Sequence, residues 1–246
     1  MRYEVIGQVM QSVDVHLGQG ESMYTESGGM AWMRGEIDMK TDTRGGLMKG
    51  LGRALAGESL FMTTYTCRAG EALIVFTPEA PGKVLDVQLA SGQTLICQKD
   101  AFMCAEGSAQ LEMFFRKRLG AGLFGGEGFI LQKVTGPGVV FLEIPGELRE
   151  YTLASGELLQ VDPGHVAAYE PTVDFDIMRV KGVKNIFFGG EGLFLATLRG
   201  TGTVYLQSLP FSRMCDRILA HAPSRGGSRK GEGSILGGLG GLIGGD

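Results

Sequence analysis

The chain has 246 residues, of which 41 are Gly, with 43% hydrophobic and 20% charged residues. This apolar content, and the near balance of 23 Lys and Arg against 27 Asp and Glu, exclude an intrinsically disordered chain. The formal net charge of −4 argues against binding of nucleic acid through bulk positive charge, because duplex binding needs a basic face. The length allows one large all-β domain or two ordinary domains.

The first residues, MRYEVIG, contain neither the apolar stretch nor the cleavage site of a secretory signal. The sequence contains no run of about 18 apolar residues, so no membrane-spanning helix is expected. The four cysteines form no CxxC pair and fit no zinc-ribbon spacing: Cys67, Cys97, Cys104 and Cys215. We therefore expect reduced cysteines packed in a core. We also expect a cytoplasmic protein, with peripheral contact to a membrane left open.

In chain order, the first recurring motif is a Gly-containing turn that follows a Leu. It occurs in residues 17–21, 89–93 and 153–157. Each copy is followed by apolar residues, a Gly or Asp turn and a second apolar stretch. Those second stretches are residues 30–33, 101–104 and 166–169.

A second motif recurs in phase with the first and begins with Gly-Glu, as GESLFM, GEGFIL and GEGLFL. These are residues 57–62, 126–131 and 190–195. Each copy leads through a short strand to a glycine turn, at residues 69–70, 136–138 and 200–202. A second apolar strand follows each turn, at residues 72–76, 139–142 and 204–206. Two motifs that recur together predict an internal repeat.

The repeated unit has the pattern of β-structure. Its runs are short, rich in Val, Ile, Leu, Phe and Tyr, and bounded by turn residues. One such unit cannot bury its apolar face alone, but several stacked units can. We therefore predict an all-β fold of three fused β-sandwich-like repeats, in a pseudo-threefold prism or barrel over residues 1–211.

Two segments lie outside the repeats. Residues 43–56 read TRGGLMKGLGRALA and have apolar residues at helical spacing with basic residues between them. They form either an amphipathic helix that touches a partner or membrane, or a connection that caps one end of the barrel. The candidate interaction surface is Leu47, Met48, Leu51, Arg53 and Leu55.

At the C-terminus, residues 212–223 predict a terminal helix, within an apolar pattern that spans 209–222 and with Ser212 as its N-cap. Residues 224–246 are rich in Gly and Ser, and we expect a flexible tail there.

Motifs for chemistry are scarce. Residues 120–125 match GxGxxG but lack the strand-to-helix context of a dinucleotide site, so no cofactor is expected. The repeated Glu58, Glu127 and Glu191 could converge into a cation-binding ring, or each could accept hydrogen bonds from its own turn. These glutamates are the weak metal candidates. No catalytic set is visible, and we expect no enzyme.

Three stretches carry a resemblance to a known family: residues 45–67, 124–143 and 188–207, the last two reading FGGEGFILQKVTGPGVVFLE and FGGEGLFLATLRGTGTVYLQ. They resemble the Aim-type mitochondrial biogenesis family, named for altered inheritance of mitochondria, and specifically its bacterial branch of unknown function. The resemblance implies a fold like that of the tryptophan RNA-binding attenuation protein, with three units in one chain. It transfers no catalytic residue and no binding of tryptophan or RNA.

The resulting hypothesis is a non-enzymatic β-scaffold that acts through protein–protein or membrane-surface contacts, as a homo-oligomer. Two alternatives stay open: a small-ligand or cation-binding module, and an RNA-binding regulator, although the acidic charge balance predicts no nucleic-acid partner.

Overall fold

The computed structural model describes residues 1–26, 28–42, 61–117, 129–179 and 194–221. In these ranges the chain is made almost entirely of strands, with two 3-10 turns and one helix, α3 (Phe211–His221). The predicted all-β class with a short C-terminal helix is confirmed. The strands are β1 (Arg2–Ile6), β2 (Ser12–Gly18), β3 (Ser22–Glu26), β4 (Met30–Asp42), β5 (Met62–Phe76), β6 (Gly82–Leu89), β7 (Thr94–Gln98), β8 (Phe102–Glu106), β9 (Gln110–Lys117), β10 (Phe129–Thr135), β11 (Gly138–Pro145), β12 (Leu148–Leu153), β13 (Leu158–Val161), β14 (Val166–Tyr169), β15 (Val173–Arg179), β16 (Phe194–Gly200) and β17 (Gly202–Gln207).

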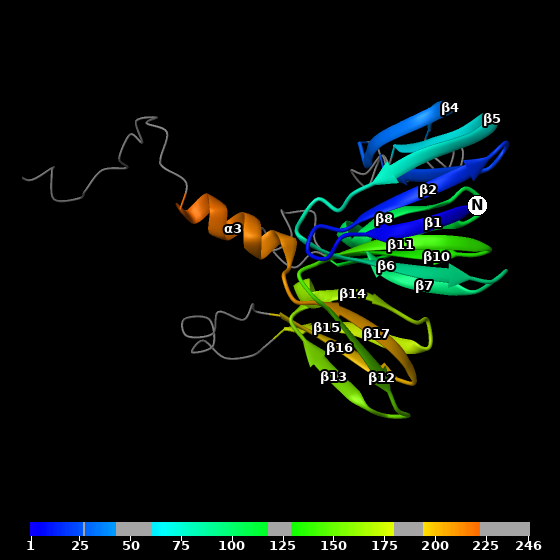
Figure 1. Ribbon diagram of the computed structural model, residues 1–246. Helices are drawn as coiled ribbons and strands as arrows, with labels where there is room; N and C mark the ends of the chain where they lie inside the picture. The colour runs from blue at the N-terminus through cyan, green and yellow to red at the C-terminus, as the bar shows by residue number, and fades with distance from the viewer. Residues whose placement is uncertain (27, 43–60, 118–128, 180–193, 222–246) are drawn as a thin grey trace, which may run out of the picture.

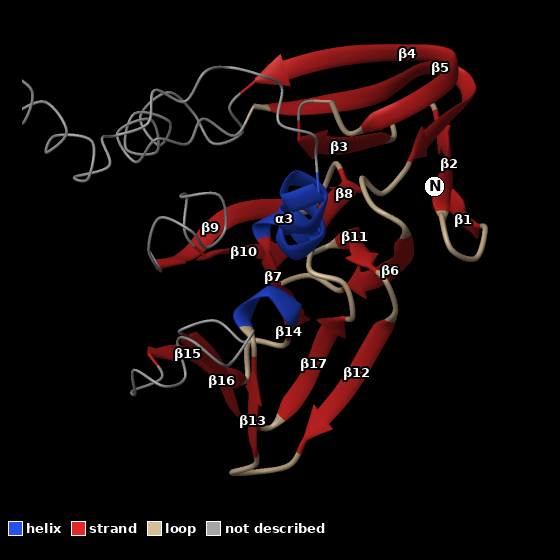
Figure 2. Cartoon of the chain, turned by 90° about the vertical axis from the view of Figure 1, so that its left-hand side faces the viewer, coloured by secondary structure: helices blue, strands red, loops and turns tan. Residues whose placement is uncertain are grey.

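These strands form three antiparallel sheets. The sheet orders are β1-β2-β5-β3-β8-β11-β6 with β4 also paired to β5, then β12-β17-β14-β7-β10-β9, and then β13-β16-β15. The sheets stack along one direction, with β4 and β5 at one end and β12 and β13 at the other (Figures 1 and 2). Helix α3 points away from the strands (Figure 1).

The same pairing scheme occurs in three successive segments, which we call units 1 (β2–β5), 2 (β6–β11) and 3 (β12–β17). In unit 2, β11 pairs with β6 and β8, while β10 pairs with β7 and β9. In unit 3, β17 pairs with β12 and β14, while β16 pairs with β13 and β15. In unit 1, the long strand β5 corresponds to both central strands, and the long strand β4 corresponds to both β8 and β9 of unit 2.

Unit 1 differs from the prediction at residues 69–70, where a tight turn was expected. Instead, β5 runs unbroken through Gly70, whose φ is +65°. Strand β4 likewise runs through Gly35, at φ +105°, with register shifts beside it. Glycine adopts positive φ without the steric cost that other residues meet, so both strands bend without ending. The result is one long antiparallel β4–β5 pair at the end of the molecule (Figure 2).

The first recurring motif folds into the same turn in each unit. Gly20, Gly92 and Gly156 have φ of +84°, +79° and +78°, the left-handed region that favours glycine. The side chain that follows each glycine accepts a hydrogen bond from the backbone amide three residues earlier. These bonds are Gly18 N to Glu21 Oε2 at 2.7 Å, Ala90 N to Gln93 Oε1 at 2.8 Å, and Ala154 N to Glu157 Oε2 at 2.9 Å. The recurring turns predicted from the sequence are therefore present.

The cysteines match the expectation of core packing in three of four cases. Cys67, Cys97 and Cys104 are buried free thiols, and Cys215 is a half-buried free thiol on α3. Helix α3 begins at Phe211, so Ser212 lies in its first turn and is not the N-cap; the Met214 amide instead donates to Pro210 O at 3.2 Å. None of the helices in the described ranges has the length and apolar character needed to cross a membrane.

Candidate functional site: an interaction surface

The site residues predicted from the sequence lie outside the described residues. These are the three glutamates Glu58, Glu127 and Glu191, and the candidate interaction surface Leu47, Met48, Leu51, Arg53 and Leu55. Both hypotheses stay predictions.

Three strand segments occupy the same place in their units: the start of β4, β8 and β14. In each of them, the pairing with the central strand skips one residue. The skip lies between Met30 and Trp32 in β4, between Phe102 and Cys104 in β8, and between Val166 and Ala168 in β14. By this register, Trp32 corresponds to Cys104 and Ala168, which lie opposite Val75, Phe141 and Tyr205 respectively. Met33 then corresponds to Ala105 and Tyr169.

The surroundings of these equivalent residues differ sharply. In β8, Cys104 and Ala105 are both 0% exposed, and in β14, Ala168 and Tyr169 are 0% and 1% exposed. In β4, Trp32 is 55% exposed and Met33 is 37% exposed. The reason is that β8 and β14 each have a second neighbouring strand, β3 and β7, whereas β4 pairs with β5 alone among the described strands.

We call residues Met30–Arg34 the β4 edge. Its backbone presents donors and acceptors on one side that no described strand uses, and its side chains include a large exposed aromatic. An exposed strand edge with apolar side chains is a template for pairing with another chain. In the sequence, residues 30–33 are only one more apolar stretch of the repeat, and their exposure is not visible there because it depends on which strands lie beside them.

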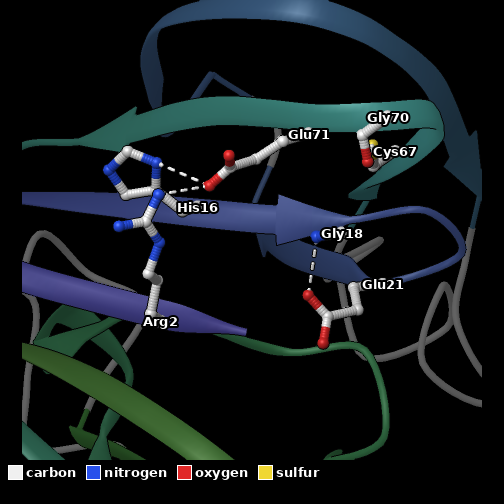
Figure 3. A network of polar contacts seen from close by, with 7 residues as sticks. All are labelled: Arg2, His16, Gly18, Glu21, Cys67, Gly70 and Glu71. Atoms are coloured by element: carbon white, nitrogen blue, oxygen red, sulfur yellow. Dashed lines mark hydrogen bonds and ion pairs between the residues drawn. The ribbon is translucent and has the colours of Figure 1, made fainter.

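A polar network lies beside β1 and ties the N-terminus to unit 1 (Figure 3). Arg2 pairs with Glu71, and His16 Nδ1 lies 3.4 Å from the same carboxylate. The Met1 amino group pairs with Glu21. The hydrogen bond from Arg2 lowers the pKa of Glu71, and that from the amino terminus lowers the pKa of Glu21. These groups line an open depression of about 540 Å³. Each charge in it has a partner, so the network fastens β1 to the sheet.

A second polar group is buried near the ends of β3 and β11. Burial raises the pKa of Glu143 to about 7, and the neighbouring carboxylates Glu79, Asp100 and Glu26 add to the rise. The Glu79 amide donates to Glu143 Oε2 at 2.7 Å. Burial also raises the pKa of Glu26, whose carboxylate accepts a long 3.5 Å hydrogen bond from Gln132 Nε2.

This buried group does not make a metal centre on the present geometry. In the part of the chain that the structure describes, no three His, Cys, Asp or Glu side chains are placed to hold one ion. The group acts instead on stability, since ionising a buried carboxyl is unfavourable.

The family described as mitochondrial biogenesis AIM24 matches residues 3–209. The chain belongs to the AIM24 family. This membership confirms the resemblance found in the sequence, and the match extends over all three units.

The AIM24 relatives include bacterial and fungal proteins. An uncharacterized protein of Streptococcus pyogenes serotype M6 is 30% identical over 220 residues, covering 86% of this chain and 87% of that protein. The mitochondrial altered inheritance of mitochondria protein 24 of Verticillium alfalfae is 23% identical over 214 residues, covering 82% of this chain and 54% of that protein.

A solved structure shares the AIM24 fold seen here. The crystal structure of protein SPYM3_0169 from Streptococcus pyogenes matches with a TM-score of 0.74 at 26% identity, covering 90% of this chain and 99% of that chain. The further likeness to the tryptophan RNA-binding attenuation protein stays a prediction.

Proposed function

We propose that this AIM24-family protein is a non-enzymatic β-scaffold that acts through protein–protein contact at the β4 edge. The observation that carries the proposal is the exposure of Trp32 and Met33 at positions whose equivalents in units 2 and 3 are buried by a neighbouring strand. A third strand placed there would bury these side chains and pair the free backbone groups, which is the mode of binding called β-augmentation.

The composition of β4 favours a protein partner over a lipid surface. From the last residue of the β4 edge onward, every second residue of the strand is charged, with basic Arg34 and Lys40 on either side of acidic Glu36 and Asp38. A membrane-surface element normally combines an apolar face with basic residues that attract anionic lipid. Mixed charge beside an unpaired strand fits the polar rim of a protein interface better.

The test is capture by the immobilised full chain, followed by reconstitution with the purified captured protein. We expect Trp32→Ser and Met33→Ser to reduce that binding at least tenfold. The matched control is Phe114→Ser, which removes a comparably exposed aromatic from β9. Equal binding by the wild type and both β4 variants would overturn the proposal. So would co-sedimentation with anionic vesicles that the β4 variants abolish, since that result would assign the β4 edge to a membrane.

A further inference from the structure

The units are joined to one another by a single kind of junction. At the first junction, β3 of unit 1 pairs with β8 of unit 2, with Tyr24 opposite Ala105 and Thr25 opposite Cys104. At the second, β7 of unit 2 pairs with β14 of unit 3, with Ile96 opposite Tyr169 and Cys97 opposite Ala168. The register is the same at both. It follows from the turns of the first motif, which place Tyr24 and Ile96 four residues after Gly20 and Gly92.

Continuing this scheme by one step assigns a partner to each remaining free edge. The strand of unit 3 that corresponds to β3 and β7 is β13, and the strand of unit 1 that corresponds to β8 and β14 is the β4 edge. Within the described part of the chain, β13 pairs only with β16, and β4 pairs only with β5. One junction of the kind made twice is therefore left open.

The burial of β13 agrees with an open junction. Residues Leu95, Ile96 and Cys97 of β7 are all buried, as are Met23, Tyr24 and Thr25 of β3. The corresponding residues of β13 are Leu159, Gln160 and Val161, of which Gln160 is exposed and the other two are half-buried. The preceding Leu158 is 43% exposed. These side chains have the exposure expected of a junction strand whose partner is missing.

The chain does not close this junction on itself. The β4 edge and β13 lie at opposite ends of the stack in both views (Figures 1 and 2). We propose that the β13 edge of one copy pairs antiparallel with the β4 edge of a second copy, in the register of the two internal junctions. That register sets Val161 opposite Trp32, Gln160 opposite Met33 and Leu159 opposite Arg34.

This inference rests on the proposed function for the exposure of the β4 edge, and it names the partner as a second copy of this chain. The contact joins two different surfaces, so an open assembly keeps one free β4 edge at one end and one free β13 edge at the other until the chain of copies closes. Such head-to-tail contacts give rings where the rotation closes and open filaments where it does not. Both products contain the same β13–β4 pairing.

The experiment is site-directed cross-linking between copies of the full chain, with Cys215→Ser in every variant to remove the half-buried thiol. Met33→Cys chains are mixed with Gln160→Cys chains under mild oxidation, and Trp32→Cys is likewise mixed with Val161→Cys. Residues opposite each other in antiparallel strands have Cα atoms about 4.5–5.5 Å apart, which is within reach of a disulfide. The control mixture is Met39→Cys with Gln160→Cys, since Met39 is an exposed residue of β4 outside the junction.

We expect a cross-linked dimer from at least one of the two mixtures and at least tenfold less from each variant alone or from the control. Light scattering of the wild type should give a mass above one 26.2 kDa chain. Cross-linking of Met33→Cys alone would overturn the head-to-tail pairing, and equal cross-linking of the control would overturn the register. A wild type with the mass of one chain, together with no cross-linked dimer in either mixture, would overturn self-assembly. In that case, capture of a different protein that is lost in Trp32→Ser would still support the proposed scaffold.

Discussion

Replacing Glu143 by Gln should stabilise the protein above pH 7 and have little effect at pH 5. Glu143 is a buried carboxyl whose pKa is raised to about 7, from 4.5 in water, mainly because burial disfavours its charged form. A carboxyl with a raised pKa in the folded state stabilises the fold fully below its unfolded pKa. That stabilisation is lost as the pH rises from about 4.5 through 7.

The size of the effect follows from the same values. Each tenfold change in a protonation equilibrium is worth about 1.4 kcal/mol, so a rise from 4.5 to about 7 corresponds to about 3 kcal/mol of lost stability at pH 8. An amide keeps the shape and stays neutral, and its oxygen can still accept the bond from the Glu79 amide. Unit 3 already contains this substitution, because Gln207 occupies the position that corresponds to Glu143 and donates to Gly164 O at 2.8 Å.

The assay is urea unfolding of the wild type and Glu143→Gln at pH 5, 6, 7 and 8, with Glu150→Gln as the matched control on an exposed strand position. We expect the difference in unfolding free energy to grow from under about 1 kcal/mol at pH 5 to about 3 kcal/mol at pH 8. The control should show no such trend. A stabilisation by Glu143→Gln that is the same at pH 5 and pH 8 would refute the account of this buried carboxyl.

Three further outcomes are expected. Gly92→Ala should lower the unfolding free energy by about 1–2 kcal/mol in urea titration. The cost is conformational, because the φ of Gly92 is +79° and no atom lies within 4 Å of the added Cβ. An unchanged urea midpoint would contradict a left-handed conformation at this turn. Phe141→Ala, at a fully buried position, should cost about 3–5 kcal/mol in the same assay, and a loss below 1 kcal/mol would place that ring outside the core. A thiol reagent should modify Cys215 quickly in the folded protein and reach Cys97 and Cys104 only in denaturant, because burial raises the pKa of both inner thiols; four fast thiols would contradict this packing.

The sequence predicts those parts of the fold that depend on neighbouring residues. The turns at Gly20, Gly92 and Gly156 are visible because each needs a glycine at a left-handed φ, and this local requirement leaves the same letters in each unit. The β-class follows from the short Val- and Phe-rich runs between those turns. Family membership follows from the same repeated letters.

The sequence does not predict the features that depend on residues far apart in the chain. Trp32 and Met33 have the same apolar character as Cys104 and Ala105, and only the presence of β3 beside β8 buries the second pair. Gly70 suggests a turn, as the glycines of the other units do, but here the strand continues through it. The hydrogen bonds that Glu21 and Glu157 accept are likewise visible only in the structure, because the letters of the first motif do not show where these side chains point.

Hydrogen exchange of the wild-type chain at two concentrations tests the central claim, that the third junction is made between copies. We predict that the amides of Met30–Arg34 and Leu158–Val161 are protected at high protein concentration. Their exchange should become faster on dilution, while the amides of β8 and β14 stay protected throughout. Fast exchange of both edges at every concentration would contradict the claim, and so would protection of one edge without the other.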